Sequence, residues 1–161
     1  MCRYVLALLI VAAPFFAFAA ELPKEGSFDY TSCNSGVSSE IKFSKTYTGS
    51  SYEITGTNRS NPPGGLFDKS TFRCVGMNTS FDGKDTGSAV CEAIDPDGDK
   101  RLSYFSFGSD GKTTRTQVAG TGKYEGIVVT LNSFENLGPF PAIKDGTVQN
   151  CNHQTGTYKL K

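Results

Sequence analysis

Residues 72–93 read FRCVGMNTSFDGKDTGSAVCEA, and this stretch decides the fold of the chain. Its Asp82-Gly83 pair is a strong signal for a two-residue β-hairpin turn, because both turn positions need a positive φ. With Phe81 opposite Lys84, Cys74 falls directly opposite Cys91, at a pair without cross-strand hydrogen bonds, where side chains approach most closely. The stretch therefore predicts an antiparallel hairpin closed by a Cys74–Cys91 disulfide.

The other cysteines complete a disulfide framework. With Cys2 assigned to a removable leader, Cys33 and Cys151 remain and are predicted to pair, tying the first strand to the last. The alternatives are free buried cysteines or a zinc site. A zinc site is disfavoured because no Cys-x-x-Cys occurs and His153 is the only histidine. We expect no metal and no cofactor.

Residues 1–19 are typical of a signal peptide. Arg3 supplies the positive start, residues 4–13 form an apolar run, and Ala17-Phe18-Ala19 is a small-x-small cleavage site. Cleavage after Ala20 is the second choice, and an uncleaved anchor is the alternative to a signal. The mature domain, 20–161, is expected to be exported, periplasmic or secreted, with no membrane association after cleavage.

Composition narrows the function classes. Residues 20–161 carry 15 basic and 16 acidic residues and no basic run, so nucleic acid is not expected as a partner. Only 27 of these 142 residues are Ile, Leu, Val or Phe, which is near the lower limit for a stable core, so the disulfides are expected to add needed stability. The composition excludes a helical bundle and a membrane-spanning protein.

Further Asp-Gly pairs, Asp97-Gly98 and Asp110-Gly111, extend the hairpin into a meander if they too are two-residue turns. The pattern predicts an all-β fold: a single antiparallel meander β-barrel of about eight or nine short strands, stapled by two disulfides. A two-sheet sandwich is the alternative. The strands are expected at 26–32, 37–44, 50–58, 70–80, 87–95, 100–107, 113–119, 126–133 and 155–160.

The same registers sort side chains onto two faces. One face has mainly small residues: Phe72, Cys74, Gly76, Ala89, Cys91, Ala93, Leu102, Tyr104 and Gln117. The other has larger apolar residues around a charged pair: Arg73, Val75, Met77, Val90, Glu92, Ile94, Ser103, Phe105, Phe107, Thr116 and Val118. The second face is the expected interior, although the first could also pack inward.

Two sets of motifs resemble known families. Residues 120–127, GTGKYEGI, resemble a segment of the small β-barrel families related to allene oxide cyclase and dirigent proteins, which implies a barrel. Residues 64–68, 73–77, 90–92 and 155–158 resemble uncharacterised exported bacterial proteins of similar length. The catalytic residues of the cyclase have no position-by-position match here, so the resemblance implies fold and not reaction.

Arg73 and Glu92, predicted to lie opposite each other, are the candidates for chemistry. Inside a barrel, a carboxylate beside an arginine could hold a polar ligand group or move a proton. Tyr104 and Tyr124 could donate hydroxyl hydrogen bonds. The alternative is an ordinary cross-strand ion pair with tyrosines that only pack.

Three other motifs favour structural interpretations. Asp95-Pro96-Asp97-Gly98-Asp99 resembles the start of a calcium loop but lacks the later Gly and Glu, so a solvated hairpin tip is expected. Gly120–Gly126 is expected to form a corner with glycine at positive φ rather than an anion-binding loop. His153 has no recognisable triad partner and is expected to be structural or exposed.

Three functions remain open. The first is binding of a small, partly apolar ligand in the barrel lumen. The second is a cyclase or isomerase that works through Glu92 and tyrosine hydroxyls. The third is a structural or interaction protein of the cell envelope with a filled core.

Overall fold

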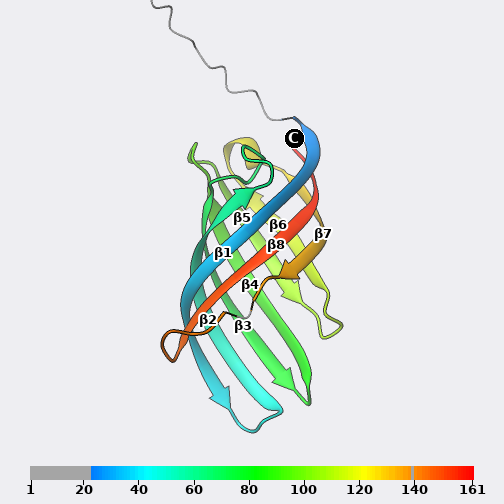
Figure 1. The fold of residues 1–161 in the computed structure, drawn as a ribbon. Helices are drawn as coiled ribbons and strands as arrows, with labels where there is room; N and C mark the ends of the chain where they lie inside the picture. The colour runs from blue at the N-terminus through cyan, green and yellow to red at the C-terminus, as the bar shows by residue number, and fades with distance from the viewer. Residues whose placement is uncertain (1–22, 139) are drawn as a thin grey trace, which may run out of the picture.

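The computed structural model describes residues 23–138 and 140–161, so the predicted signal peptide lies outside the described residues. The chain forms one eight-stranded antiparallel sheet that curls into a tall barrel (Figure 1). The elements are β1 (Glu25–Lys42), β2 (Tyr47–Ser60), β3 (Thr71–Phe81), β4 (Lys84–Ile94), β5 (Lys100–Phe107), β6 (Thr113–Gly120), the 3-10 turn η1 (Gly122–Tyr124), β7 (Val128–Asn136) and β8 (Thr147–Lys159).

Every strand lies beside its sequence neighbours, and the barrel closes where the first strand pairs with the last. The sheet order is β6-β5-β4-β3-β2-β1-β8-β7. β6 and β7 pack against each other, but in the described part of the chain no ladder of hydrogen bonds joins them. The predicted all-β, nearly closed barrel is therefore confirmed, with its one seam between β6 and β7.

Both predicted disulfides are confirmed. Cys74 and Cys91 are paired across β3 and β4, and Cys33 and Cys151 are paired across β1 and β8. The second bridge spans 118 positions of sequence and locks the closing strand pair. Two disulfides are consistent with an oxidising, exported location.

The three Asp-Gly turns are not alike. Asp82 and Gly83 both have positive φ, 54° and 74°, and Phe81 faces Lys84 as predicted. At Asp97-Gly98 only the glycine has positive φ, and the loop has three residues, because the N–H of Asp95 donates to the carbonyl of Asp99. The loop before Lys112 is built in the same way, with the Gly108 N–H donating to the Lys112 carbonyl. Treating these two as two-residue turns was wrong, and each shifted the predicted register by one residue.

The expected interior face was also wrong. Cys74, Ala89 and Ala93 point inward and are buried, whereas Val75 and Met77 are 46 % and 54 % exposed on the outside. The register shift in β5 moves Phe105, which faces Ala89 across the sheet, onto the interior face. Small residues therefore line this wall of the barrel interior.

β1 is one strand of 18 residues where the sequence pattern indicated two. It pairs with β2 over Tyr30–Lys42 and with β8 over Glu25–Val37, so both of its edges are hydrogen-bonded through the expected break. Gly36 lies in this stretch, and a Cβ there would come within 1.9 Å of the Glu53 carbonyl oxygen. Glycine allows this close approach of neighbouring strands.

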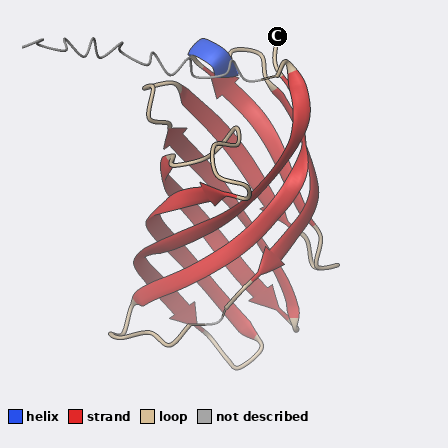
Figure 2. Cartoon of the chain, turned by 45° about the horizontal axis from the view of Figure 1, so that its top comes forward, coloured by secondary structure: helices blue, strands red, loops and turns tan. Residues whose placement is uncertain are grey.

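The upper end of the barrel in Figure 1 is plugged by the loop 61–70 and by η1, which folds over the rim (Figure 2). Phe67, on the loop, is fully buried and packs edge-to-face on Phe28 and Tyr30, with ring centroids 5.2 and 5.5 Å apart. Burial of a phenylalanine contributes about 1.5–3 kcal/mol. The core lies at this end: Phe28, Tyr30, Leu66, Phe67, Tyr124, Ile127 and Tyr158.

Asp68 holds the plug loop in place. Its carboxylate accepts the backbone N–H groups of Ser60 and Gly64, both at 3.0 Å. Although partial burial opposes ionisation, these N–H donors hold the pKa of Asp68 below its usual range. The loop is thus fixed at both ends, and Phe67 projects into the barrel.

Candidate functional site

Beneath the plug lies a cavity in the barrel lumen. Its volume is about 90 Å³, which is room for several waters or a small chemical group. The walls are mostly apolar and include the Cys74–Cys91 disulfide, Phe72, Phe105 and Ala89. The end of the cavity nearest the plug is polar and contains two arginines, Arg101 and Arg115.

Arg101 enters the lumen from β5 and is only 3 % exposed. Its Nη2 donates to the Ser70 hydroxyl at 2.9 Å, and its guanidinium carbon lies 4.4 Å from the centroid of the Phe67 ring. Ser70 also accepts from the Asn58 side-chain amide at 2.9 Å and donates to the Phe67 carbonyl at 2.8 Å. The hydroxyl of the loop residue Ser70 is therefore fully bonded, and Arg101 Nη1 has no partner among the residues that the structure describes.

Arg115 enters from β6 and is 8 % exposed. Its Nη1 donates to the Tyr30 hydroxyl at 3.1 Å and its Nη2 to the Ser103 hydroxyl at 3.4 Å. The guanidinium lies 4.9 Å from the Phe67 centroid, so both arginines contact the same buried ring. Arg115 Nε is buried and has no partner within residues 23–138 and 140–161.

A chain of neutral side chains supports Arg115. Tyr30 donates to Gln154 Oε1 at 2.6 Å, and Gln154 Nε2 donates to Asn152 Oδ1 at 2.8 Å. On the other side, Ser103 donates to Gln117 Oε1 at 3.0 Å. In the described part of the chain, every side-chain oxygen that accepts from either arginine therefore belongs to a neutral residue.

Two positive charges thus share one end of the lumen. Within the described residues, neither guanidinium forms an ion pair with a carboxylate. Burial lowers the pKa of Arg101, and the nearby charge of Arg115 lowers it further. Arginine still remains protonated, so the lumen carries uncompensated positive charge.

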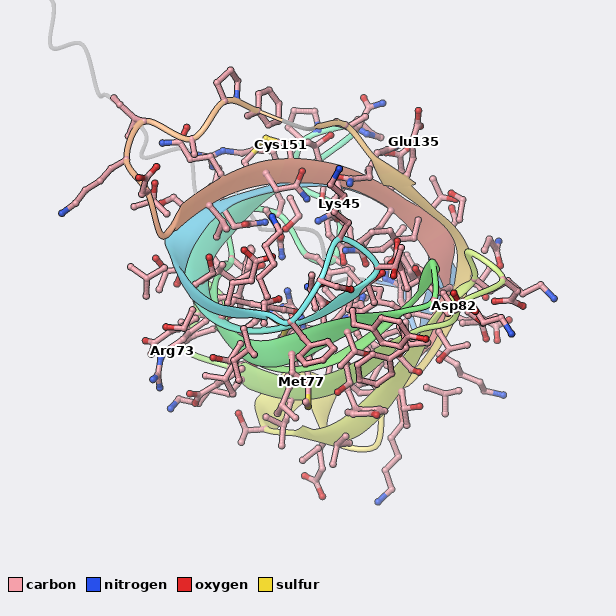
Figure 3. All side chains as sticks on the ribbon, turned by 90° about the horizontal axis from the view of Figure 1, so that it is seen from below. Lys45, Arg73, Met77, Asp82, Glu135 and Cys151 are labelled. Carbon is pink, nitrogen blue, oxygen red and sulfur yellow. A yellow bond between two sulfur atoms is a disulfide. The ribbon has the colours of Figure 1, made fainter. Side chains whose placement is uncertain are left out.

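The lower end of the barrel, opposite the plug, opens to solvent (Figure 3). Phe107 and Phe134 line both the cavity and an outer vestibule, and their rings meet edge-to-face with centroids 6.0 Å apart. The vestibule rim is polar, with Thr48, Asn78 and Lys112 among its residues. A ligand would therefore enter past the two phenylalanines and meet the arginines last.

The structure places the predicted site residues outside the lumen. Arg73 and Glu92 are opposed in the register as predicted, but both point to solvent, and Arg73 lies outside the ring of strands in Figure 3. Arg73 Nε donates to Glu53 Oε1 at 2.8 Å, and Lys100 Nζ donates to Glu92 Oε1 at 3.0 Å. Tyr104 is 40 % exposed on the same outer surface. Arg73 and Glu92 were expected inside because the wrong face of the sheet was taken as the interior.

Tyr124 is fully buried in the plug and donates to the Leu66 carbonyl at 2.9 Å. Burial raises the pKa of Tyr124 to about 12. The corner that carries it is built as predicted, with positive φ at Gly122 and Gly126. A Cβ at Gly120 would lie 2.0 Å from the Tyr124 carbonyl oxygen, so glycine is required there.

The acidic tip at Asp95–Asp99 is tied to this corner. Lys123 Nζ pairs with the carboxylates of Asp95 and Asp97. Asp95 Oδ1 accepts the N–H groups of Asp97 and Asp99 at 2.9 and 3.0 Å. Burial alone would raise the pKa of Asp95, but the hydrogen bond from Lys123 and its charge lower it. The carboxylates of Asp95 and Asp97 therefore bind the protein's own ammonium group.

His153 lies on β8 and is half-buried, with Nε2 2.8 Å from Asp29 Oδ1 and Nδ1 3.9 Å from Glu135 Oε2. These neighbouring acids come from β1 and β7 and could not be found from the local sequence. Asp29 directly precedes Tyr30, which points into the lumen. Because successive side chains of a strand point to opposite faces, Asp29 and His153 lie on the outer surface.

The sequence interpretation missed Arg101 and Arg115. One signal was present. Pro96 has φ fixed near −65°, which suits the second position of a type I turn and therefore a three-residue loop at Pro96-Asp97-Gly98. That loop puts Arg101 and Ser103 on the same face as Cys91. The contacts with Phe67 depend on the plug loop and had no local signal.

Comparisons with family models, with curated proteins and with solved structures find no match to this chain. None of the helices among the described residues is long and apolar enough to cross a membrane. The candidate site therefore rests on its own geometry.

Proposed function

We propose that this protein is an exported barrel that binds a small, partly apolar ligand in its lumen. The observation that carries the proposal is the cavity itself, which is lined by aromatic rings and a disulfide and reached through an open end. Binding sites of this kind are concave and mostly apolar, with a few convergent polar groups. The signal-like residues 1–19 and the two disulfides support export to an oxidising compartment.

The cavity is small for a whole drug-sized ligand, since pockets for such ligands span roughly 300–1,000 Å³. A ligand that fits would place one end in the lumen and the rest between Phe107 and Phe134 or in the vestibule. The resemblance of residues 120–127 to allene oxide cyclase and dirigent barrels supports the barrel and adds no reaction. With Arg73 and Glu92 on the outer surface, we place binding ahead of cyclase or isomerase activity.

Native mass spectrometry of protein purified from its own compartment tests this proposal. We expect a bound small molecule that is absent after denaturation. Ala89→Trp should lose it, because Ala89 is buried in the lumen wall and a large ring there fills the cavity. The matched control is Val90→Trp, the adjacent residue, which is 41 % exposed on the outside. Equal loading of both variants would contradict lumen binding.

A role in interaction is the second candidate, and the outer surface favours it. Val75, Val90 and Tyr104 are neighbours across β3, β4 and β5 in the register, and each is at least 40 % exposed. Exposed apolar groups that are contiguous are typical of contact surfaces. Sedimentation of the wild type against Val90→Lys tests this candidate, since only an interaction surface predicts a smaller species in the variant.

A further inference from the structure

At the plugged end of the lumen, two arginine charges have no counter-ion and two N–H donors have no acceptor among the described residues. Arg101 Nη1 and Arg115 Nε are buried N–H donors without a partner in the described chain. The two side chains are 3 % and 8 % exposed, so bulk water does not solvate them. Both belong to the lining of the same cavity.

The protein compensates these charges only in part. Stacking on Phe67 and hydrogen bonds to Ser70, Tyr30 and Ser103 supply neutral partners. Buried charge without a counter-ion is costly, and neutral acceptors do not remove the net charge. Bound water could satisfy the free N–H groups, but only an anion would neutralise the lumen.

Asp95, the acid that acts electrostatically on Arg101, does not serve as its counter-ion. Asp95 is close enough to act electrostatically on Arg101, but its carboxylate pairs with Lys123. The positive charge of the lumen therefore remains available to a ligand.

We infer that the ligand is an anionic amphiphile whose single carboxylate-sized head group binds between Arg101 and Arg115 and whose apolar chain runs toward Phe107 and Phe134. This inference rests on the proposed function, because it needs a ligand in the lumen. The fork geometry of guanidinium groups suits a carboxylate, and each contact would be a charge-assisted hydrogen bond. The chain would then contact Phe72, Phe105 and the Cys74–Cys91 disulfide, which line the cavity.

Octanoate and octan-1-ol are the probes, because they share one chain and differ in the charge of the head group. We expect octanoate to bind at least about tenfold more tightly than octan-1-ol, measured by calorimetry, since hydrogen bonds to a charged group are worth roughly that factor or more. In ¹H–¹⁵N spectra, octanoate should shift the Nε–Hε signal of Arg115, and octan-1-ol should leave it near its free position. Inorganic phosphate, an anion without a chain, should bind more weakly than octanoate.

Two variants separate the claims. Arg115→Met keeps an apolar chain of similar length and should reduce the preference for octanoate over octan-1-ol, because only Arg101 then remains to bind the head group. Ala89→Trp should bind neither probe. Equal affinity of the two probes for the wild type, or an Arg115 signal unmoved by octanoate, would overturn the anionic head group while lumen binding stands. Phosphate that binds as tightly as octanoate would overturn the apolar chain. If Ala89→Trp binds both probes as the wild type does, the lumen proposal fails with the inference.

Discussion

Arg115 Nη1 donates a 3.1 Å hydrogen bond to the hydroxyl of Tyr30, and this bond joins β6 to β1 across the closed end of the lumen. Because arginine can only donate, the Tyr30 hydroxyl must accept here and give its own proton to Gln154 Oε1, 2.6 Å away. The donor and the acceptor of both hydrogen bonds are therefore fixed. Arg115 is held by hydrogen bonds from Nη1 and Nη2, and its buried Nε has no partner among the described residues.

The free energy of unfolding of Arg115→Met distinguishes two roles of Arg115, ligand binding and support of the fold. A buried charge without a counter-ion is costly, so an apolar side chain of similar size in its place removes that cost. We therefore expect the free energy of unfolding of the empty protein to be unchanged or higher in Arg115→Met, as measured by urea denaturation. A loss of about 3 kcal/mol or more, the cost typical of broken buried pairs, would show that Arg115 serves the fold.

The two disulfides should differ in their effect on stability. The Cys33–Cys151 bridge spans 118 positions and the Cys74–Cys91 bridge spans 17. In the chain-entropy model their loss costs about 5 and about 3 kcal/mol, respectively. Guanidinium unfolding of the two double alanine variants measures both. A larger loss for the Cys74/Cys91 variant would mean that packing in the lumen wall outweighs chain entropy.

Stability should fall at alkaline pH through Tyr124. Burial raises its pKa in the folded protein to about 12, from 10.0 in the unfolded chain. The raised pKa stabilises the fold fully below pH 10, and this contribution is lost as the pH rises toward 12. Tyr124→Phe should lose about 1 kcal/mol at pH 8, from the hydrogen bond to Leu66, but decline less steeply above pH 10. Urea unfolding of both proteins at pH 8, 10 and 11 measures this difference. If the free energy of unfolding falls equally steeply with pH in both, Tyr124 does not have this role.

On the outer surface Arg73 pairs with Glu53 and not with Glu92, so the titration of Glu53 measures this ion pair. The hydrogen bond from Arg73, and then its charge, hold the pKa of Glu53 below its usual range. In Arg73→Ala the pKa of Glu53 should rise toward the usual value, as followed by NMR titration of the carboxyl carbon. The stabilisation is present above the usual pKa and is lost as the pH falls through the lowered one. Arg59→Ala, on the same strand as Glu53, is the control and should leave the titration unchanged.

Local chemistry was enough to predict the framework. Asp82-Gly83 needs positive φ at both positions, so it fixed one register and with it the Cys74–Cys91 pair. That left Cys33 with Cys151 and predicted the closure of the barrel. Where Pro96 precedes Asp97-Gly98, the same dipeptide makes a three-residue loop, and the register derived from the dipeptide alone was wrong.

The interior could not be predicted from strand patterns. The lumen wall at Ala89 and Ala93 is made of small residues and borders the cavity, whereas the buried core rings come from β1, β8, the plug loop and η1. Size on one strand is therefore a poor guide to which face is buried. Arg101 and Arg115 are brought together around Phe67 and Ser70 because loop 61–70 enters the lumen. These are tertiary contacts that strand patterns do not predict.

A crystal structure of the protein grown with octanoate tests the central claim most directly. The account predicts a carboxylate within hydrogen-bonding distance of Arg101 Nη1 or Arg115 Nε, with the chain extending toward Phe107 and Phe134. A lumen that holds only water, with octanoate bound on the outer surface near Val75 and Val90, would contradict it.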